Sequence, residues 1–202
     1  MNWFWKRREW KSLQNKNIVV RSRFGKTEVI VGGCVQTSSD YTHRMWKHVF
    51  KRISSLKNPE EIRSALLLGL GAGGCIKPLH DAFPLCTLTA VEFDPTMVDI
   101  ARRLQFFAPY PLPKIHCADA KDAISQMEEQ FDLVVVDLFV GTKLSPLVSD
   151  EAFLKKLRER LASGGILVVN VLGDVRVIPR IASIFTQQRV LNFGFNQFAV
   201  CW

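Results

Sequence analysis

The chain has 202 residues, a length that predicts one main globular domain with a small appendage. Although 48% of the residues are hydrophobic, no apolar run reaches the length of a membrane span. Its formal net charge is +8, but residues 1–57 carry 13 Lys or Arg against three acidic residues, so the basic character belongs to the N-terminal quarter. The five cysteines lie far apart with no Cys-x-x-Cys pair, which argues against a metal site. Together with the absence of a secretory signal, these scattered cysteines predict a cytoplasmic protein.

Residues 1–13 are predicted to form a basic, aromatic N-terminal tail. Three tryptophans and one phenylalanine alternate there with four cations. This composition suits an anionic membrane surface, stacking on nucleic acid, or packing against the protein's own body. Residues 1–26, which include the next basic residues, are therefore candidates for contact with nucleic acid or an anionic membrane.

Residues 14–57 are predicted to form a small β-meander followed by a linker helix. The stretch 17–37 is rich in β-branched residues and is divided by Gly25 and by Gly32-Gly33, which are turn signals. Asp40 is then expected to cap a helix that runs to about Ser54, with apolar residues at helical spacing.

Residues 58–202 are predicted to form a nucleoside-binding Rossmann-like domain, because apolar strands alternate with amphipathic helices. We expect core strands at 65–68, 86–91, 114–117, 131–137 and 166–171, and two closing strands within 189–202. Helices are expected at 75–83, 96–107, 120–129, 150–161 and 174–187, the last of them interrupted near Pro179. The fold class is therefore α/β, a doubly wound, mainly parallel seven-stranded sheet. A last strand that enters antiparallel is typical of the methyltransferase-type sheet.

The stretch 65–74 joins the first core strand to a glycine-rich loop. Gly69, Gly71 and Gly74 fit the G-x-G-x-x-G dinucleotide pattern, whereas Gly69, Gly71 and Gly73 fit the G-x-G-x-G loop of S-adenosylmethionine-type folds. A plain strand-to-helix turn would also need glycines, so the loop by itself leaves all three interpretations open.

Acidic residues follow the next three core strands, at the sheet edge where ligands of such folds bind. Glu92 lies 18 residues after Gly74, about where a carboxylate accepts hydrogen bonds from ribose hydroxyls. Asp119 could accept the exocyclic amine of adenine or cap the following helix. Asp137 ends the most apolar strand and could hold a sulfonium or ammonium group, or fix the loop at Gly141.

The combination of these motifs resembles the spermidine synthases, the polyamine aminopropyltransferases, within the S-adenosylmethionine-dependent methyltransferase-type fold. The resemblance covers most of residues 14–202. It implies S-adenosylmethionine or decarboxylated S-adenosylmethionine as co-substrate. By the same resemblance, Gly69, Gly71 and Gly73 would contact its aminoacyl or aminopropyl end. Glu92 would hold the ribose and Asp119 the adenine. It implies that Asp137 lies beside the transferred group, which makes this residue the candidate catalytic group, and that the chain associates as a homodimer. The motifs that carry it are Leu67–Gly74, Val91–Pro95, Cys117–Ala120 and Phe131–Asp137.

Two departures from the family pattern bear on the reaction. The family usually has an aspartate where this chain has Ala72, and a second aspartate, the proton acceptor, where this chain has Val140. The acids of the family's linker helix are also not evident, since Thr42-His43-Arg44 stand there. A polyamine substrate needs several carboxylates and a base, so polyamine activity is in doubt.

Three classes of function follow from the sequence. The leading one is a spermidine synthase-like transferase that moves an aminopropyl or methyl group from its nucleoside co-substrate to an unidentified acceptor. The alternative is a non-catalytic nucleoside-binding or basic-surface adaptor module. A nicotinamide-dependent oxidoreductase ranks last, because it explains neither Asp119 nor Asp137.

Overall fold

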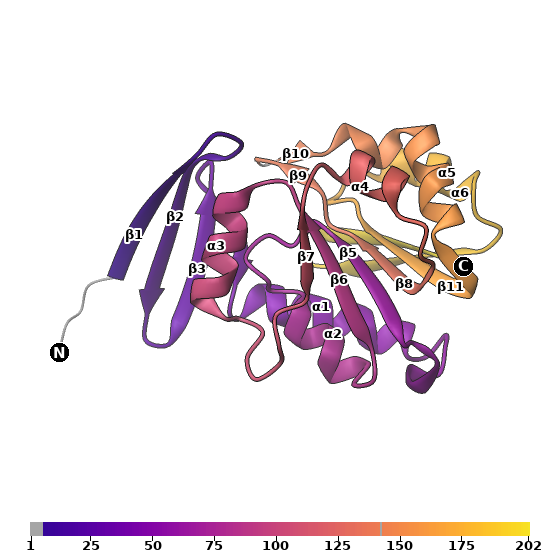
Figure 1. Ribbon diagram of the computed structural model, residues 1–202, viewed down its shortest axis with the longest axis horizontal. Helices are drawn as coiled ribbons and strands as arrows, with labels where there is room; N and C mark the ends of the chain where they lie inside the picture. The colour runs from indigo at the N-terminus through magenta and orange to yellow at the C-terminus, as the bar shows by residue number, and fades with distance from the viewer. Residues whose placement is uncertain (1–5, 142) are drawn as a thin grey trace.

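Figure 1 shows the chain as a computed structural model, which describes residues 6–141 and 143–202. An antiparallel sheet formed by the N-terminal residues stands beside a larger α/β unit, and helix α3 (Pro95–Leu104) lies between the two (Figure 1). Within the described residues, no helix is both long and apolar enough to cross a membrane.

The larger unit is built on a seven-stranded sheet whose central strands are apolar throughout. Leu66, Leu67 and Leu68 are fully buried, as are the four residues 133–136 of the neighbouring strand, which is what a strand covered on both faces requires. The strand order is β12-β13-β11-β8-β5-β6-β7, and β13 runs antiparallel to β11. The strands are β5 (Ser64–Leu68), β6 (Thr87–Glu92), β7 (Lys114–Cys117), β8 (Phe131–Val136), β11 (Leu161–Asn170), β12 (Gln188–Phe193) and β13 (Asn196–Cys201). The predicted fold class is confirmed, including the antiparallel last strand.

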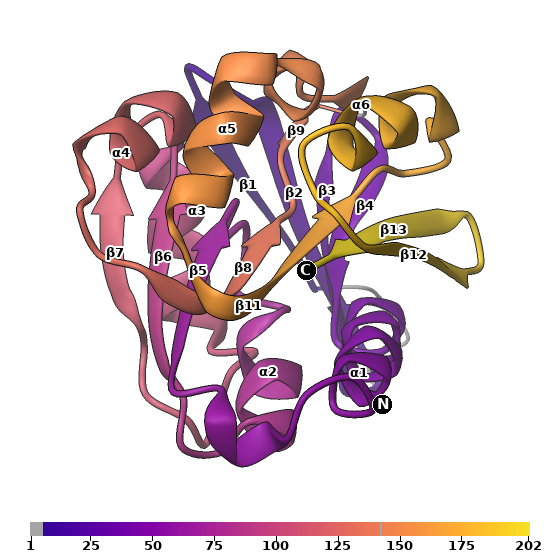
Figure 2. The same cartoon turned by 90° about the vertical axis from the view of Figure 1, so that its right-hand side faces the viewer.

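Helices cover both faces of this sheet (Figure 2). Alternate residues of each strand point to opposite faces. On one face Leu67 and Val135 pack with helices α1 and α2, and on the other Leu66 and Val134 pack with α4 and α5, whose bounds are given below. The remaining α-helices are α1 (Tyr41–Ile53), α2 (Ile76–Ala82), α4 (Ala120–Gln126), α5 (Glu151–Glu159) and α6 (Ile178–Ala182). Short 3₁₀ turns are η1 (Pro59–Glu61), η2 (Pro146–Ser149) and η3 (Val175–Val177).

Two segments of the larger unit differ from their expected form. The last helix, expected over 174–187 with an interruption near Pro179, consists of η3 and the short α6, which ends at Ala182; Pro179 lacks the N–H that an interior helical position would donate. The stretch 141–149, expected as a loop, contains β10 (Lys143–Leu144), which pairs with β9 (Phe139–Val140) in a small hairpin.

The N-terminal sheet has four antiparallel strands in sequential order, β1 (Lys6–Ser12), β2 (Lys16–Arg23), β3 (Lys26–Val31) and β4 (Cys34–Ser38). The prediction of a tail over residues 1–13 is therefore wrong for residues 6–12, which pair with β2 from Lys6 opposite Ser22 to Ser12 opposite Lys16. The pairing sets Trp10 opposite Ile18, so the indole packs against the apolar cluster under the sheet. Residues 1–5 lie outside the described residues, and contact of residues 1–26 with nucleic acid or a membrane stays a prediction.

Asp94 joins the N-terminal sheet to the larger unit. Its side chain, 1% exposed, caps α3 by accepting from the Thr96 N–H at 2.8 Å. It also accepts from Asn15 Nδ2 at 2.7 Å and from the Ser12 hydroxyl, both in or beside the β1–β2 turn. The linker helix α1 buries Met45 and Trp46 in the same core as β5 and β8. Both connections hold the N-terminal sheet against the carboxyl edge of the seven-stranded sheet.

Candidate functional site

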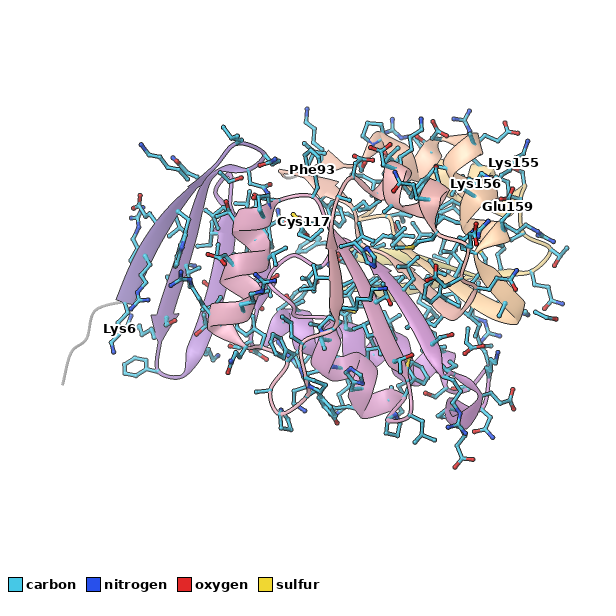
Figure 3. All side chains as sticks on the ribbon, viewed as in Figure 1. Lys6, Phe93, Cys117, Lys155, Lys156 and Glu159 are labelled. Atoms are coloured by element: carbon cyan, nitrogen blue, oxygen red, sulfur yellow. The ribbon has the colours of Figure 1, made fainter. Side chains whose placement is uncertain are left out.

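A cavity of about 570 Å³ lies between the N-terminal sheet and the carboxyl edge of the larger sheet. Much of its lining comes from the carboxyl ends of four core strands. These residues are the turn after β5, Glu92 at the end of β6 with Phe93 after it, Asp137 after β8, and Asn170 at the end of β11. Figure 3 labels Phe93 at this edge, in the region where β9 and β10 lie. The opposite wall comes from β4, the start of α1 and the β12–β13 turn. We call this space the nucleoside cavity, after the ligand that the sequence predicts at this edge.

The glycine turn brings backbone close to neighbouring backbone. Gly69 has φ +92°, and a Cβ there would lie 2.2 Å from the carbonyl oxygen of Asp137, so no other residue fits. Gly71 and Gly74 also line the cavity. Gly73 does not, because its α-carbon faces Ile76 and other side chains behind the turn. Of the three glycines expected at the co-substrate, Gly69 and Gly71 thus face the cavity, and Gly73 shapes the turn.

Glu92 is held at the centre of this edge by backbone groups. The Gly71 N–H donates to Oε2 at 2.7 Å and the Asp94 N–H donates to Oε1 at 3.0 Å. Burial raises the pKa of Glu92 above its ordinary value, while these two N–H groups act in the opposite direction. The carboxylate is therefore fixed in orientation and still faces the cavity.

Asp137 is the most perturbed carboxylate of the site. Burial raises its pKa from an ordinary 3.8 to about 6, the Asn170 side chain lowers it by donating Nδ2–H to Oδ1 at 2.9 Å, and the charge of Glu92 raises it further. Cys75 lines the same wall, and burial together with Asp137 raises the pKa of its thiol well above the ordinary value. The thiol therefore remains neutral, and Asp137 is the group that can exchange a proton near neutral pH.

Asp119 follows β7, and its side chain caps α4. The Lys121 N–H donates to Oδ1 at 2.7 Å. The residues on either side, Ala118 and Ala120, line the cavity, whereas Asp119 itself does not. The cap is thus observed, and a contact between Asp119 and adenine stays a prediction.

The two positions that depart from the family pattern lie away from the cavity. Ala72 is fully buried among Val29, Val31 and Ile100 beneath the N-terminal sheet, where a carboxylate would be costly to bury. Val140 is 63% exposed on β9. Neither position adds a charge to the nucleoside cavity.

The charge of the nucleoside cavity is opposite to that of the whole chain. Among the described residues that line it, three are acidic, Glu28, Glu92 and Asp137, and none is Lys, Arg or His. Glu28 is paired with Arg21 at 2.6 Å. The cavity therefore favours cationic ligands, although the N-terminal quarter that forms one of its walls is strongly basic.

Several polar lining residues were missed by sequence reasoning. Gln36 donates from Nε2 to the Gly141 carbonyl oxygen at 2.7 Å, and Tyr41 Oη accepts from Asn196 Nδ2 at 3.0 Å. Gln36 and Tyr41 come from the N-terminal sheet and linker helix, so no core-strand pattern points to them. Asn170 could have been found, because it ends the fifth core strand at the same edge as Glu92. The described residues contain no group of three His, Cys, Asp or Glu that could hold a metal ion.

Sequence comparison relates the chain to two kinds of transferase. A family model described as a methyltransferase domain matches residues 66–169. The eEF1A lysine and N-terminal methyltransferase of Mus musculus is 31% identical over 140 residues, which are 62% of this chain and 20% of that protein. The polyamine aminopropyltransferase of Vibrio vulnificus is 30% identical over 125 residues, which are 60% of this chain and 42% of that protein. The chain thus spans less than half the length of these curated relatives.

Two solved structures share the fold. A spermidine synthase in complex with the transition state analogue AdoDATO matches with a TM-score of 0.74 at 17% identity, covering 100% of this chain and 80% of the other. Human methyltransferase-like protein 13 in complex with SAH matches with a TM-score of 0.63 at 24% identity, covering 80% of this chain and 81% of the other. At these identities the likeness concerns the fold, and the first match extends over the N-terminal sheet.

Proposed function

The chain belongs to the methyltransferase domain family, and from this premise we propose that it transfers a methyl group from S-adenosylmethionine to an amine. It is a transferase with a spermidine synthase-like form of the methyltransferase-type fold. The observation that carries the proposal is the nucleoside cavity, where carboxylates surround a glycine turn and no cation stands among the described lining residues.

The donor is proposed to bind along the carboxyl edge of the sheet. Each oxygen of Glu92 accepts one backbone N–H, which fixes the carboxylate and leaves lone pairs for the ribose hydroxyls. Phe93 offers an aromatic face to the adenine, and Asp119 can accept the adenine amine through Oδ2, because its helix cap uses Oδ1. The sulfonium is then attracted by the negative charge of Asp137.

The acceptor is proposed to be an amine because an amine must lose a proton before it attacks. With a pKa of about 6, Asp137 is mainly ionised at neutral pH and can accept that proton. The amine nitrogen then forms a bond to the methyl carbon, the carbon–sulfur bond breaks, and its electron pair remains on sulfur in S-adenosylhomocysteine. The named acceptors of the two curated relatives, a lysine or N-terminus and a polyamine, are amines as well.

Methyl transfer is preferred to aminopropyl transfer because of Ala72 and Asp137. The ammonium of decarboxylated S-adenosylmethionine lacks the neighbouring carboxylate that balances it in S-adenosylmethionine, so it needs a carboxylate from the protein, yet Ala72 is apolar and buried away from the cavity. Of the three cavity carboxylates, Glu28 is paired with a cation and Glu92 with backbone N–H groups. One carboxylate, Asp137, is left for one amine. Aminopropyl transfer is the second candidate, favoured by the fold likeness that covers the whole chain.

The product nucleoside separates these reactions. The full chain is incubated with S-adenosylmethionine or its decarboxylated form and with a lysine-containing peptide, a peptide with a free N-terminus, or putrescine, and the nucleosides are resolved by chromatography. Formation of S-adenosylhomocysteine supports methyl transfer, and methylthioadenosine identifies aminopropyl transfer instead. Tight binding of a nucleoside without turnover of any acceptor would leave the non-catalytic binding module as the function.

A further inference from the structure

A second cavity, of about 950 Å³, adjoins the nucleoside cavity. Its walls come from the outer face of β1, β2 and β3, from the turns at 14–15 and 32–33, and from the β9–β10 hairpin. Asn15, Val31 and Gly141 line both cavities, so the two spaces are neighbours. We call this second space the basic groove, after its lining residues Arg7, Arg21 and Lys143.

The two neighbouring spaces have opposite charge. The described lining residues of the basic groove include three cations and no acid, whereas those of the nucleoside cavity include three acids and no cation. The ion pair between Arg21 and Glu28, at 2.6 Å, stands at the boundary, with the cation towards the groove and the acid towards the cavity. Neutral donors accompany the cations, because the amides of Gln14 and Asn17 also line the groove.

This arrangement selects against a free polyamine. Such a molecule carries ammonium groups along its whole length, so with one amine at Asp137 a further ammonium would enter a space lined by Arg7, Arg21 and Lys143. Like charges in one site repel each other. A ligand that spans both spaces must instead place an amine in the cavity and negative charge in the groove.

We infer that the acceptor is an amine carried by an acidic peptide segment, such as a lysine or N-terminus with Asp or Glu beside it. The inference rests on the proposed amine methylation and adds the substrate class. The peptide amine enters the nucleoside cavity beside Asp137, and the neighbouring carboxylates pair with Lys143 and Arg7 in the basic groove. Arg7 is paired with Glu9 at 2.7 Å, but both side chains are more than half exposed, and such a pair exchanges partners at little cost. A volume of about 950 Å³ holds a few residues of a peptide.

The experiment compares three peptides of equal length whose single lysine is flanked by Glu, Gln or Arg. Methylation is measured as release of S-adenosylhomocysteine. Peptide binding is measured separately by fluorescence anisotropy in the absence of S-adenosylmethionine. We expect kcat/KM for the Glu-flanked peptide to exceed that for the Gln-flanked peptide by about tenfold, since the two exposed pairs with Lys143 and Arg7 each contribute a modest gain. The advantage should shrink as salt is raised from 50 to 500 mM.

Charge-reversal variants assign the preference to the basic groove. Lys143→Glu and Arg7→Glu should each reduce the preference for the Glu-flanked peptide at least threefold, and Lys143→Gln should reduce it less. The matched control is Lys155→Glu on α5, an exposed lysine paired with Glu151 at 2.6 Å. Figure 3 shows Lys155 at the end of the molecule opposite to Lys6 and the N-terminal sheet. The control should leave the preference unchanged.

The outcomes separate this inference from the proposed function. If S-adenosylmethionine binds and all three peptides are methylated equally, or if Lys155→Glu has the same effect as Lys143→Glu, the acidic-peptide inference is overturned while methyl transfer stands. If a short single-stranded RNA binds the groove tightly, and Lys143→Glu abolishes that binding without changing the peptide preference, nucleic acid replaces the peptide as the occupant. If no nucleoside binds, the proposed function itself fails.

Discussion

Replacing Asp137 with Asn should make the ligand-free protein more stable while it removes activity. Burial raises the pKa of Asp137 from 3.8 to about 6, so at neutral pH the folded chain holds a charge that the unfolded chain solvates better. At about 1.36 kcal/mol per pKa unit this difference amounts to about 3 kcal/mol. Because Asp137 lines a cavity that admits water, we expect about 1–2 kcal/mol. The Asn side chain can still accept the hydrogen bond from Asn170.

The raised pKa of Asp137 also makes the free energy of unfolding depend on pH. Between pH 3.8 and about 6 the folded chain binds more protons at Asp137 than the unfolded chain does, so its contribution to the free energy of unfolding falls as pH rises through that window. Asp137→Asn should therefore be more stable than the original chain at pH 7.5 and nearly equal to it at pH 4. Catalysis should fall about 10²–10⁴-fold, because the proton acceptor is lost.

Urea unfolding at pH 4 and pH 7.5 measures this difference. The matched control is Asp132→Asn at the other end of β8, where one carboxylate oxygen accepts from the Arg63 N–H, the Ser64 N–H and the Ser64 hydroxyl at 2.9–3.0 Å. That variant should lose stability, because charge-assisted hydrogen bonds become neutral ones. The reasoning is refuted if Asp137→Asn is less stable at pH 7.5, or if its advantage is the same at both pH values.

Three further substitutions test the geometry of the site. Gly69→Ala should lower the free energy of unfolding by about 2–5 kcal/mol, from backbone strain and a clash with the Asp137 carbonyl oxygen. Its control, Gly164→Ala, has φ +68° but open space around the new Cβ, and should cost only about 1–2 kcal/mol. Equal urea midpoints for the two variants would contradict the clash. Asn15→Ala should lower stability by about 1.5 kcal/mol through the lost bond to Asp94, and an unchanged urea midpoint would show that this link is not important. Asp119→Ala should uncap α4 and also weaken S-adenosylmethionine binding measured by calorimetry. The control Asp150→Ala, which uncaps α5, should affect stability alone. Equal affinities of the two variants for S-adenosylmethionine would restrict Asp119 to its role as a helix cap.

The larger sheet could be predicted from the sequence because its signals are local. Each central strand is an apolar run, and Asp119 caps α4 as its position allowed. Asp40, expected to cap α1, stands at the N-cap position but its side chain makes no capping hydrogen bond. Glu92 and Asp137 were expected at one site because both follow carboxyl ends of strands in one sheet. The structure brings both to the wall of one cavity.

What the sequence left undetermined depends on contacts between distant residues. Residues 6–12 have the composition of a tail and become a strand only because β2 offers a partner. Whether Gly73 or Gly74 faces the cavity is decided by the path of the turn, which the glycine pattern does not fix. The net charge of +8 also conceals the separation of acids and cations between the two adjoining spaces, since Arg21 and Glu28 are neighbours across the sheet and not along the chain.

The central claim, that the carboxylate-lined cavity binds S-adenosylmethionine, is tested most directly by isothermal titration calorimetry. The full chain and Glu92→Gln are titrated with S-adenosylmethionine, its decarboxylated form, S-adenosylhomocysteine and methylthioadenosine. We predict that S-adenosylmethionine and S-adenosylhomocysteine bind the original chain most tightly, and that Glu92→Gln weakens both at least tenfold, because an amide cannot replace the carboxylate at two backbone N–H groups and the ribose. Absence of binding by all four nucleosides, or equal affinities in Glu92→Gln, would contradict the claim.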